Sequence, residues 1–319
     1  MKRIARVIIA ATVLVTASGF AGAQSQRPIR VLVPSPPAGP SDVQIRLLVP
    51  KMSESLGRML LVDNRAGVNG VLGTEIASKA TPDGYTLAVG NSGTHAVNAT
   101  LYQKLAYDPV RDFIPITLFS TTGMVLAGNP KLPGSKLQDL IEHAKKYPGQ
   151  TNIAIAGATG QLAGDSLWAR LQIQMNNVNY KGSSPSELAV LAGESQLSLL
   201  TPLASANHIR SGRMKPYGIT SAQRHPLLPD VPTVAEQGVP GYAMEYWNGL
   251  FAPAKTPDKL VRALHKAAVD ALATPDVKDR FNALGLVIVG NTPEAFAQVV
   301  KADVEKFRKV ILESGIPRL

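Results

Sequence analysis

The sequence contains no cysteine among its 319 residues, and aromatic residues make up only 5% of it. Without cysteine the chain cannot form a disulfide, a Cys-ligated zinc site or an iron–sulfur cluster, and it has no thiol nucleophile. Charged residues make up 18% and hydrophobic residues 45%, which excludes an intrinsically disordered chain. At roughly 150 residues per domain, the length suggests about two folded domains.

Catalytic and nucleotide-binding motifs are also missing. The sequence has no G-x-S-x-G elbow, no Walker A motif and no complete G-x-G-x-x-G fingerprint. Its five histidines show no metal-ligand spacing such as H-x-x-x-H. We therefore expect neither an enzyme nor a metal or other cofactor.

The formal charge of +10 raises the possibility of a nucleic-acid partner. However, the basic residues are scattered among acidic ones and are not interleaved with aromatic residues. A solvated surface explains this pattern better, and we expect no binding to nucleic acid.

The N-terminus has the three parts of a secretory signal peptide. Lys2, Arg3 and Arg6 precede an apolar run over 7–17, and Ala21-Gly22-Ala23 forms an A-x-A cleavage site. A membrane anchor is the alternative, but a span needs about 20 apolar residues, and threonine, serine and glycine interrupt this run. We expect residues 1–23 to be removed and the protein to be exported to the periplasm. Loss of the three basic residues lowers the charge from +10 to +7.

From residue 28 onward, short β-branched runs alternate with amphipathic segments. The expected strands cover 29–34, 59–62, 86–89, 113–119, 152–156, 177–180, 196–200, 215–220 and 246–251. The expected helices cover 42–56, 67–80 after a glycine-rich turn, 135–146 with Ser135 as N-cap, 162–175, 185–192, 202–211, 257–273, 275–284 and the segment from 292. This alternation predicts an α/β fold with parallel sheets covered on both faces.

Two strand-to-helix turns are the sequence features that suggest a binding site. The first runs from Pro34 to Asp42 and the second from Ala156 to Gln161. Helix N-termini at the carboxyl ends of parallel strands present backbone N–H groups and a positive dipole end to an anion. Helix capping alone could explain Ser41 and Asp42, but not the rigid Pro36-Pro37 pair and the small residues after it. The segment 91–94 is a third candidate, and together the turns predict a clamp on a small anion.

Seven ordered sequence blocks make the chain resemble a known family. The blocks are Arg27-Pro28-Ile29-Arg30 with the Pro-Pro-Ala-Gly-x-x-Asp turn; Val62-Asp63-Asn64-Arg65; Lys79 to Leu87; Leu101-Tyr102 with Tyr107-Asp108-Pro109; Tyr180-Lys181-Gly182; Leu228 to Thr233; and Trp247 to Pro253. In this order they resemble the Bug-type periplasmic receptors, the extracytoplasmic solute-binding components of tripartite tricarboxylate transporters. The resemblance covers residues 27–319.

The resemblance implies a type II periplasmic binding protein fold, with two α/β domains joined by two crossing strands and a ligand cleft between them. The implied domains are 27–124 plus 245–319, and 125–244. A ligand carboxylate is expected between the two turns, held largely by backbone amides and bridging waters. The ligand-binding residues that the resemblance implies are Pro37, Ala38, Gly39, Ser41, Asp42, Asn91, Ser92, Ala158, Thr159, Gly160, Gln161 and Thr201.

Several positions depart from the usual family pattern. Ser35 stands where Phe is usual, Gln161 where His is common, and Thr201 where many members have Asp. Ala38-Gly39 replaces the usual Gly-Gly, and the second turn lacks the usual serines. These departures leave the identity of the ligand open among dicarboxylates, tricarboxylates, acidic amino acids and aromatic acids.

The functional expectation is a monomeric solute receptor that captures a small carboxylate for a membrane permease. The alternative is a sensor component that presents the ligand to a membrane signalling partner without transport. Genes for a permease pair or for a sensor kinase beside this one would separate the two. A periplasmic enzyme would need a reactive constellation that the sequence does not contain.

Overall fold

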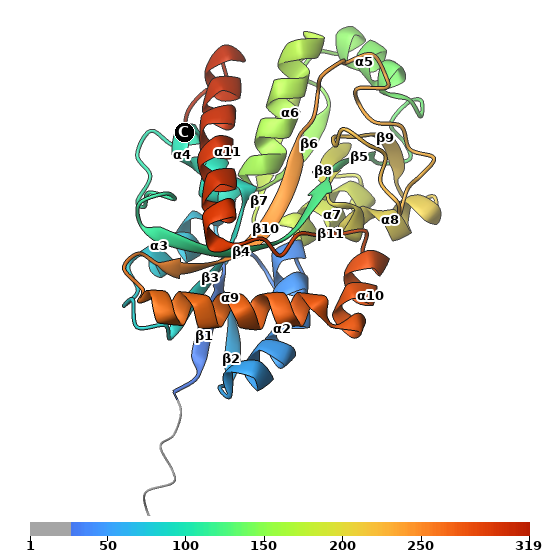
Figure 1. The fold of residues 1–319 in the computed structure, drawn as a ribbon. Helices are drawn as coiled ribbons and strands as arrows, with labels where there is room; N and C mark the ends of the chain where they lie inside the picture. The colour runs from blue at the N-terminus through green and yellow to red at the C-terminus, as the bar shows by residue number, and fades with distance from the viewer. Residues whose placement is uncertain (1–26) are drawn as a thin grey trace, which may run out of the picture.

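The computed structural model describes residues 27–319, so the expected signal peptide lies outside the described residues. The fold is α/β, as predicted (Figure 1). The strands are β1 (Ile29–Val33), β2 (Leu60–Asn64), β3 (Thr86–Asn91), β4 (Phe113–Gly123), β5 (Val125–Gly128), β6 (Asn152–Ala156), β7 (Asn176–Tyr180), β8 (Leu197–Leu200), β9 (Lys215–Ile219), β10 (Glu245–Pro253) and β11 (Val287–Ile288). The α-helices are α2 (Pro40–Leu56), α3 (Val71–Ser78), α4 (Asn98–Leu101), α5 (Leu137–Lys146), α6 (Ala158–Leu171), α7 (Ser183–Ala192), α8 (Pro202–Arg210), α9 (Asp258–Ala273), α10 (Pro275–Ala283) and α11 (Pro293–Glu313). Two short helical turns complete the set, η1 (Val68–Gly70) and η2 (Gly93–Val97).

The strands form two mixed sheets, which corrects the expectation of parallel sheets. The first has the order β11-β4-β10-β3-β1-β2, and the second β7-β6-β8-β5-β9. Only β1–β3 in the first sheet and β6–β8 in the second pair in parallel, while β4, β5, β9, β10 and β11 pair antiparallel. A parallel pair needs a crossover connection, usually a helix. Helices α2 and α3 supply it between β1, β2 and β3, and α6 and α7 supply it between β6, β7 and β8.

The chain passes between the two sheets twice, once at Met124 and once over residues 220–244. Thr220 ties the two connections together. Its backbone N–H donates to Met124 O at 2.8 Å and its hydroxyl to Met244 O at 2.6 Å. In return its hydroxyl accepts from Met124 N at 2.9 Å and its carbonyl from Met244 N at 2.8 Å. Both crossings are thus held at one buried residue.

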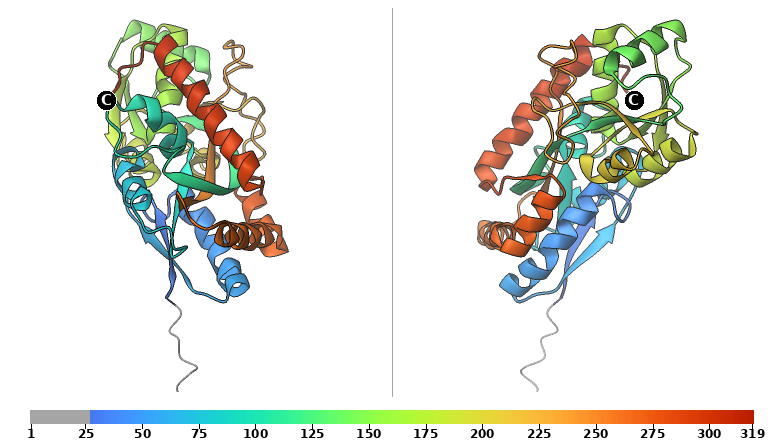
Figure 2. Two further views of the ribbon diagram at one scale, coloured as in Figure 1. Left: turned by 60° about the vertical axis from the view of Figure 1, so that its left-hand side comes forward. Right: turned by 90° about the vertical axis from the view of Figure 1, so that its right-hand side faces the viewer.

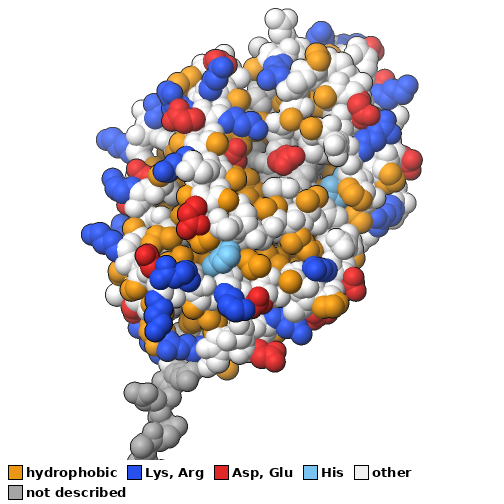
Figure 3. Space-filling model, viewed as in Figure 1, with side chains coloured by type: hydrophobic (Ala, Val, Ile, Leu, Met, Phe, Trp, Pro, Cys, Tyr) orange, Lys and Arg blue, Asp and Glu red, His pale blue; other side chains and the backbone are white. Residues whose placement is uncertain are grey.

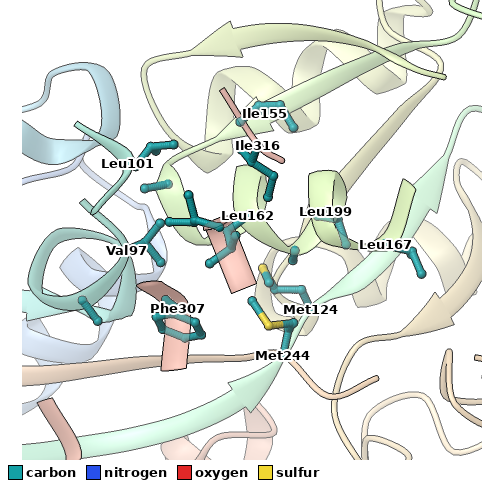
Figure 4. Close-up of a cluster of buried hydrophobic side chains, with 14 of the residues drawn as sticks. Val97, Leu101, Met124, Ile155, Leu162, Leu167, Leu199, Met244, Phe307 and Ile316 are labelled. Atoms are coloured by element: carbon teal, nitrogen blue, oxygen red, sulfur yellow. The ribbon is translucent and has the colours of Figure 1, made fainter. Parts of the chain in front are cut away.

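Three apolar clusters stabilise this arrangement. One lies in the first sheet against α2 and α9, and another within the second sheet. The third joins the two sheets and contains Val97, Met124, Leu162, Leu199 and Phe307 (Figure 4). Helix α11 contributes to it because it packs along β4, η2 and α4 and reaches α6 (Figure 2). The two sheets therefore share a core in addition to having their own.

Two predicted helix starts are corrected. Helix α6 begins at Ala158 rather than near residue 162, so the second turn is the first turn of the helix itself. The N-cap of α5 is Lys136 rather than Ser135. There the Asp139 carboxylate accepts the N–H groups of Ser135 and Lys136 at 2.8 and 3.0 Å, which replaces a serine cap.

On the face drawn in Figure 3, Lys and Arg side chains are interspersed with Asp and Glu, as expected for a solvated surface. Within residues 27–319 no helix combines the length and the apolar character that a membrane span requires.

Candidate functional site

A cavity of about 70 Å³ lies between the two sheets. The first wall of the cavity, on the side of the first sheet, is formed by Pro34, Ser35, Pro36, Gly39, Pro40, Ser41, Gly67, Asn69, Gly70, Asn91, Thr94 and Tyr246. The second wall is formed by Ala156, Gly157, Ala158, Thr159, Gly160, Tyr180, Lys181, Gly182, Ser183, Leu199 and Thr201, and Met124 lies at the crossing between them.

Four helices begin at this cavity. The N-cap residues of α2, α6, α7 and α8 are Gly39, Gly157, Gly182 and Thr201, and all four line it. None of the four helices has a side-chain hydrogen bond at its N-cap. Their first-turn N–H groups have no acceptor within the helix, and each helix carries a partial positive charge at this end. Pro40, Pro185 and Pro202 each remove one N–H but leave the dipoles in place.

The side-chain charge at the cavity is positive. Among the described residues, no Asp or Glu lines it, and Lys181 is the one cation that does. The helix ends and Lys181 therefore act in the same direction, and the cavity attracts a small anion.

Asp42 fixes the first wall from behind. Its side chain is 3% exposed and pairs with Arg46, whose Nε donates to both carboxylate oxygens at 2.9 Å. The Ala38 N–H and the Asn64 amide also donate to it, each at 2.9 Å. Burial alone would raise the pKa of Asp42, but the hydrogen bonds from Arg46, Ala38 and Asn64 outweigh burial and lower it below its ordinary value. The carboxylate thus holds the turn in shape and stays charged.

A second set of hydrogen bonds joins the first wall to β10. Ser41 Oγ donates to Asn248 Oδ1 at 2.6 Å. Tyr246 Oη lies 3.0 Å from Ser41 Oγ and 3.2 Å from Asn248 Oδ1. Burial raises the pKa of Tyr246, against the opposing effect of its hydrogen bonds to Ser41, Asn248 and Asn91, so the hydroxyl stays protonated.

The second wall leaves buried polar atoms without partners. Thr201 is 5% exposed, and its hydroxyl has no hydrogen-bond partner among the described residues. In α6, the same holds for Gln161 Oε1. An unpartnered buried polar group costs about 1–3 kcal/mol, so a native structure retains one chiefly where a ligand or water satisfies it.

The two walls touch at two points beside the cavity. At one, the hydroxyls of Ser92 and Thr159 are hydrogen-bonded at 2.9 Å, and a Cβ on Gly93 would lie 3.1 Å from the Thr159 hydroxyl. At the other, a Cβ on Gly182 would lie 2.6 Å from Pro36 Cδ, so only glycine fits there. The two walls are therefore in direct contact at these two points beside the cavity.

Seven of the twelve residues expected at the site line the cavity. They are Gly39, Ser41, Asn91, Ala158, Thr159, Gly160 and Thr201. Asp42 and Ser92 lie behind the surface and hold it, in the contacts described above. Pro37 and Ala38 are exposed beside it, and Gln161 is buried in the first turn of α6.

Sequence reasoning missed other lining residues, notably Tyr180, Lys181 and Tyr246. The first two precede Gly182 in a strand-to-helix turn like the two that were selected, so a signal was present. Tyr246 gave no local signal, because it reaches Ser41 from 205 residues away along the chain.

Residues 44–316 match the family described as the tripartite tricarboxylate transporter family receptor. This chain belongs to that receptor family. Protein BugT of Bordetella pertussis is 32% identical over 311 residues, which cover 97% of this chain and 95% of BugT. Two solved structures from Rhodopseudomonas palustris are also similar. Rpa4515 with adipate is 29% identical with a TM-score of 0.88 over 93% of this chain and 100% of that one. MatC with bound malate is 31% identical with a TM-score of 0.87 over 90% of this chain and 99% of that one.

Membership in the receptor family confirms three predictions: the Bug-type resemblance, the α/β fold of periplasmic binding proteins and the absence of an enzymatic role. The receptor family binds solutes in the periplasm, which also agrees with the expected compartment.

Proposed function

We propose that this protein is a periplasmic receptor that captures a small carboxylate in the cavity between its two sheets and delivers it to a tripartite tricarboxylate-type permease. The proposal rests on four helix N-termini that have no side-chain cap and that converge on one cavity. Among the described residues, no acidic side chain lines this cavity. Such a site binds a carboxylate through preorganised N–H groups and needs no salt bridge.

The proposed binding unit comprises the two strand-to-helix turns, the loop at Asn91 and Ser92, and Thr201. The proposed domains are residues 27–124 with 245–319, and residues 125–244. Opening would be a hinge rotation about the crossings at Met124 and Met244, which Thr220 holds together. We further propose that residues 1–23 direct export and are removed.

The related structures support carboxylates as the ligand class, since Rpa4515 is described with adipate and MatC with malate. The cavity volume of about 70 Å³ favours a small acid of that kind over a large one.

A thermal-shift screen of carboxylic acids on the purified protein tests the proposal. Malate, succinate, adipate, citrate, aspartate and benzoate form the panel, with the primary amide of each acid as its matched neutral control. Because a ligand stabilises by RT ln(1 + [L]/Kd), the midpoint for a true ligand rises with concentration, by about 2.7 kcal/mol in unfolding free energy at 100 times Kd. We expect at least one acid to do this and its amide to give a clearly smaller rise. Equal shifts from acid and amide, or no shift from any acid, would contradict a carboxylate receptor.

A further inference from the structure

Tyr246 lines the cavity, and the hydrogen bonds of its hydroxyl within the protein are long. The short Ser41–Asn248 bond of 2.6 Å uses the Ser41 proton. The Tyr246 hydroxyl then has only neutral hydrogen-bonding neighbours, Ser41 Oγ at 3.0 Å, Asn248 Oδ1 at 3.2 Å and the Asn91 side chain. Hydrogen bonds between hydroxyl groups and oxygen normally span 2.5–3.0 Å, so the contacts to Ser41 and Asn248 are at or beyond the long end of that range.

Asn248 Oδ1 accepts from both Ser41 and Tyr246, and the bond from Tyr246 is the longer of the two. No acidic side chain among the described residues lines the cavity to compete for the proton. An anionic oxygen placed in the cavity would therefore be the strongest acceptor within reach of Tyr246. Hydrogen bonds to an ionised acceptor are roughly twice as strong as those between neutral groups.

We propose that Tyr246 is a specificity-determining residue, which donates its hydroxyl proton to the ligand carboxylate and so favours the ionised acid over neutral analogues. This role rests on the proposed function of the cavity. Ser41 is a positioning residue: either hydroxyl of the Ser41–Tyr246 pair can be the donor, so Ser41 can donate to the tyrosine oxygen when Tyr246 donates to the ligand.

Tyr246 lies where β10 meets the first turn of α2. It belongs to β10, which follows the second crossing between the sheets, and it bonds to the first turn of α2. The next residue, Trp247, donates from Nε1 to Asp303 in α11 at 2.7 Å. A ligand bound to Tyr246 thus engages the strand that follows the second crossing as well as the helix ends.

The chain supplies a matched control for this residue. Tyr85 does not line the cavity, and its hydroxyl accepts from Arg58 Nη1 at 2.8 Å. Tyr85→Phe and Tyr246→Phe each remove a hydrogen-bonded tyrosine hydroxyl, and the proposal assigns ligand binding only to Tyr246.

Isothermal titration of the wild-type protein and the two variants with a stabilising acid from the screen and its primary amide tests the proposal. Tyr246→Phe should weaken binding of the acid about ten- to a hundredfold, the range for a hydrogen bond to a charged group. Binding of the amide should change less than about threefold, and Tyr85→Phe should leave both unchanged. The thermal midpoint of each variant without ligand checks that it is folded.

Equal losses in the two phenylalanine variants, or equal losses for acid and amide in Tyr246→Phe, would overturn the role of Tyr246 while leaving a carboxylate receptor intact. If the wild-type protein binds no acid at all, the proposed function fails and the role of Tyr246 fails with it.

Discussion

The two walls of the cavity are built in different ways. In the first wall, side chains fix the backbone: Asp42 binds Arg46, Asn64 and the Ala38 N–H, and Ser41 binds Asn248. In the second wall, three helix ends meet without side-chain caps, and the Thr201 hydroxyl has no partner among the described residues. Side chains thus fix the turn of the first wall, although Asn248 Nδ2 beside it has no partner among the described residues, whereas the second wall presents helix ends and a hydroxyl that a ligand would satisfy. Changes in the first wall should therefore affect stability most, and changes in the second should affect affinity most.

The largest expected effect on stability is that of Asp42→Ala. The change removes hydrogen bonds from three groups at a side chain that is 3% exposed. We expect the free energy of unfolding to fall by about 2–3 kcal/mol, measured by urea denaturation at pH 7. A loss below about 0.5 kcal/mol would show that the carboxylate does not hold this wall.

The pH dependence of stability should follow from the same carboxylate. Because the pKa of Asp42 is lowered in the folded protein, its stabilising effect is fully present above the ordinary pKa of an aspartate. The effect is lost as the pH falls through the lowered value. The stability difference between the wild type and Asp42→Asn should therefore be largest at neutral pH and shrink below about pH 4. Thermal midpoints from pH 3 to 7 measure it, and a difference that is constant over this range would exclude the linkage.

Thr201→Val should change stability and affinity in opposite directions. Removal of a buried hydroxyl without a protein partner should raise the free energy of unfolding by about 1 kcal/mol. If the ligand uses that hydroxyl, affinity should fall about fivefold, as for one ordinary hydrogen bond. Urea denaturation and isothermal titration measure the two quantities. A destabilised variant with unchanged affinity would assign Thr201 to the framework instead.

Ser92→Ala should weaken ligand binding about fivefold, because it removes a hydrogen bond that joins the two walls. The double variant Ser92→Ala/Thr159→Val, which removes both hydroxyls, should recover part of this loss, since no buried hydroxyl is then left unpaired. Ser78→Ala in α3, whose hydroxyl bonds only to Glu75 O, serves as the control. Strictly additive effects of the two changes would mean that the contact does not contribute to the ligand-bound form.

The smallest effect is expected at Ala38, which has a φ of 62° in the left-handed region. Left-handed backbone costs a non-glycine residue about 1–2 kcal/mol, and glycine costs about 0.4–1 kcal/mol through the unfolded chain. Ala38→Gly should therefore stabilise the protein by about 0.5 kcal/mol, as urea denaturation would show. Ala302→Gly on the exposed face of α11 should instead destabilise it by about 1 kcal/mol. The same sign for both would contradict strain at Ala38.

Local patterns in the sequence were sufficient for most of the helices and strands. The segment 152–156 is a strand as predicted, and Thr292 caps α11 through a hydrogen bond from the Ala295 N–H. The four-residue strand β5 was missed, because it follows β4 after a single residue and shows no periodicity of its own. The antiparallel pairing of β10 depends on partners far away in the sequence, which strand patterns do not reveal.

In the candidate site too, local features were predictable and long-range contacts were not. Both selected turns contribute to one cavity, because helix ends at the edge of a sheet can be recognised from local glycine and proline patterns. Whether a residue lines the cavity or supports it was not predictable, since Asp42 and Ser92 act through partners that only the fold brings near. Tyr246 could not be found for the same reason.

A crystal structure of the complex with an acid from the screen tests the central claim most directly. It should place a carboxylate oxygen within about 3 Å of an N–H group in the first turn of α6, α7 or α8, with the Thr201 hydroxyl also bonded to the ligand. A carboxylate that lies outside the cavity, or that faces Met124 and Leu199 instead of the helix ends, would contradict it.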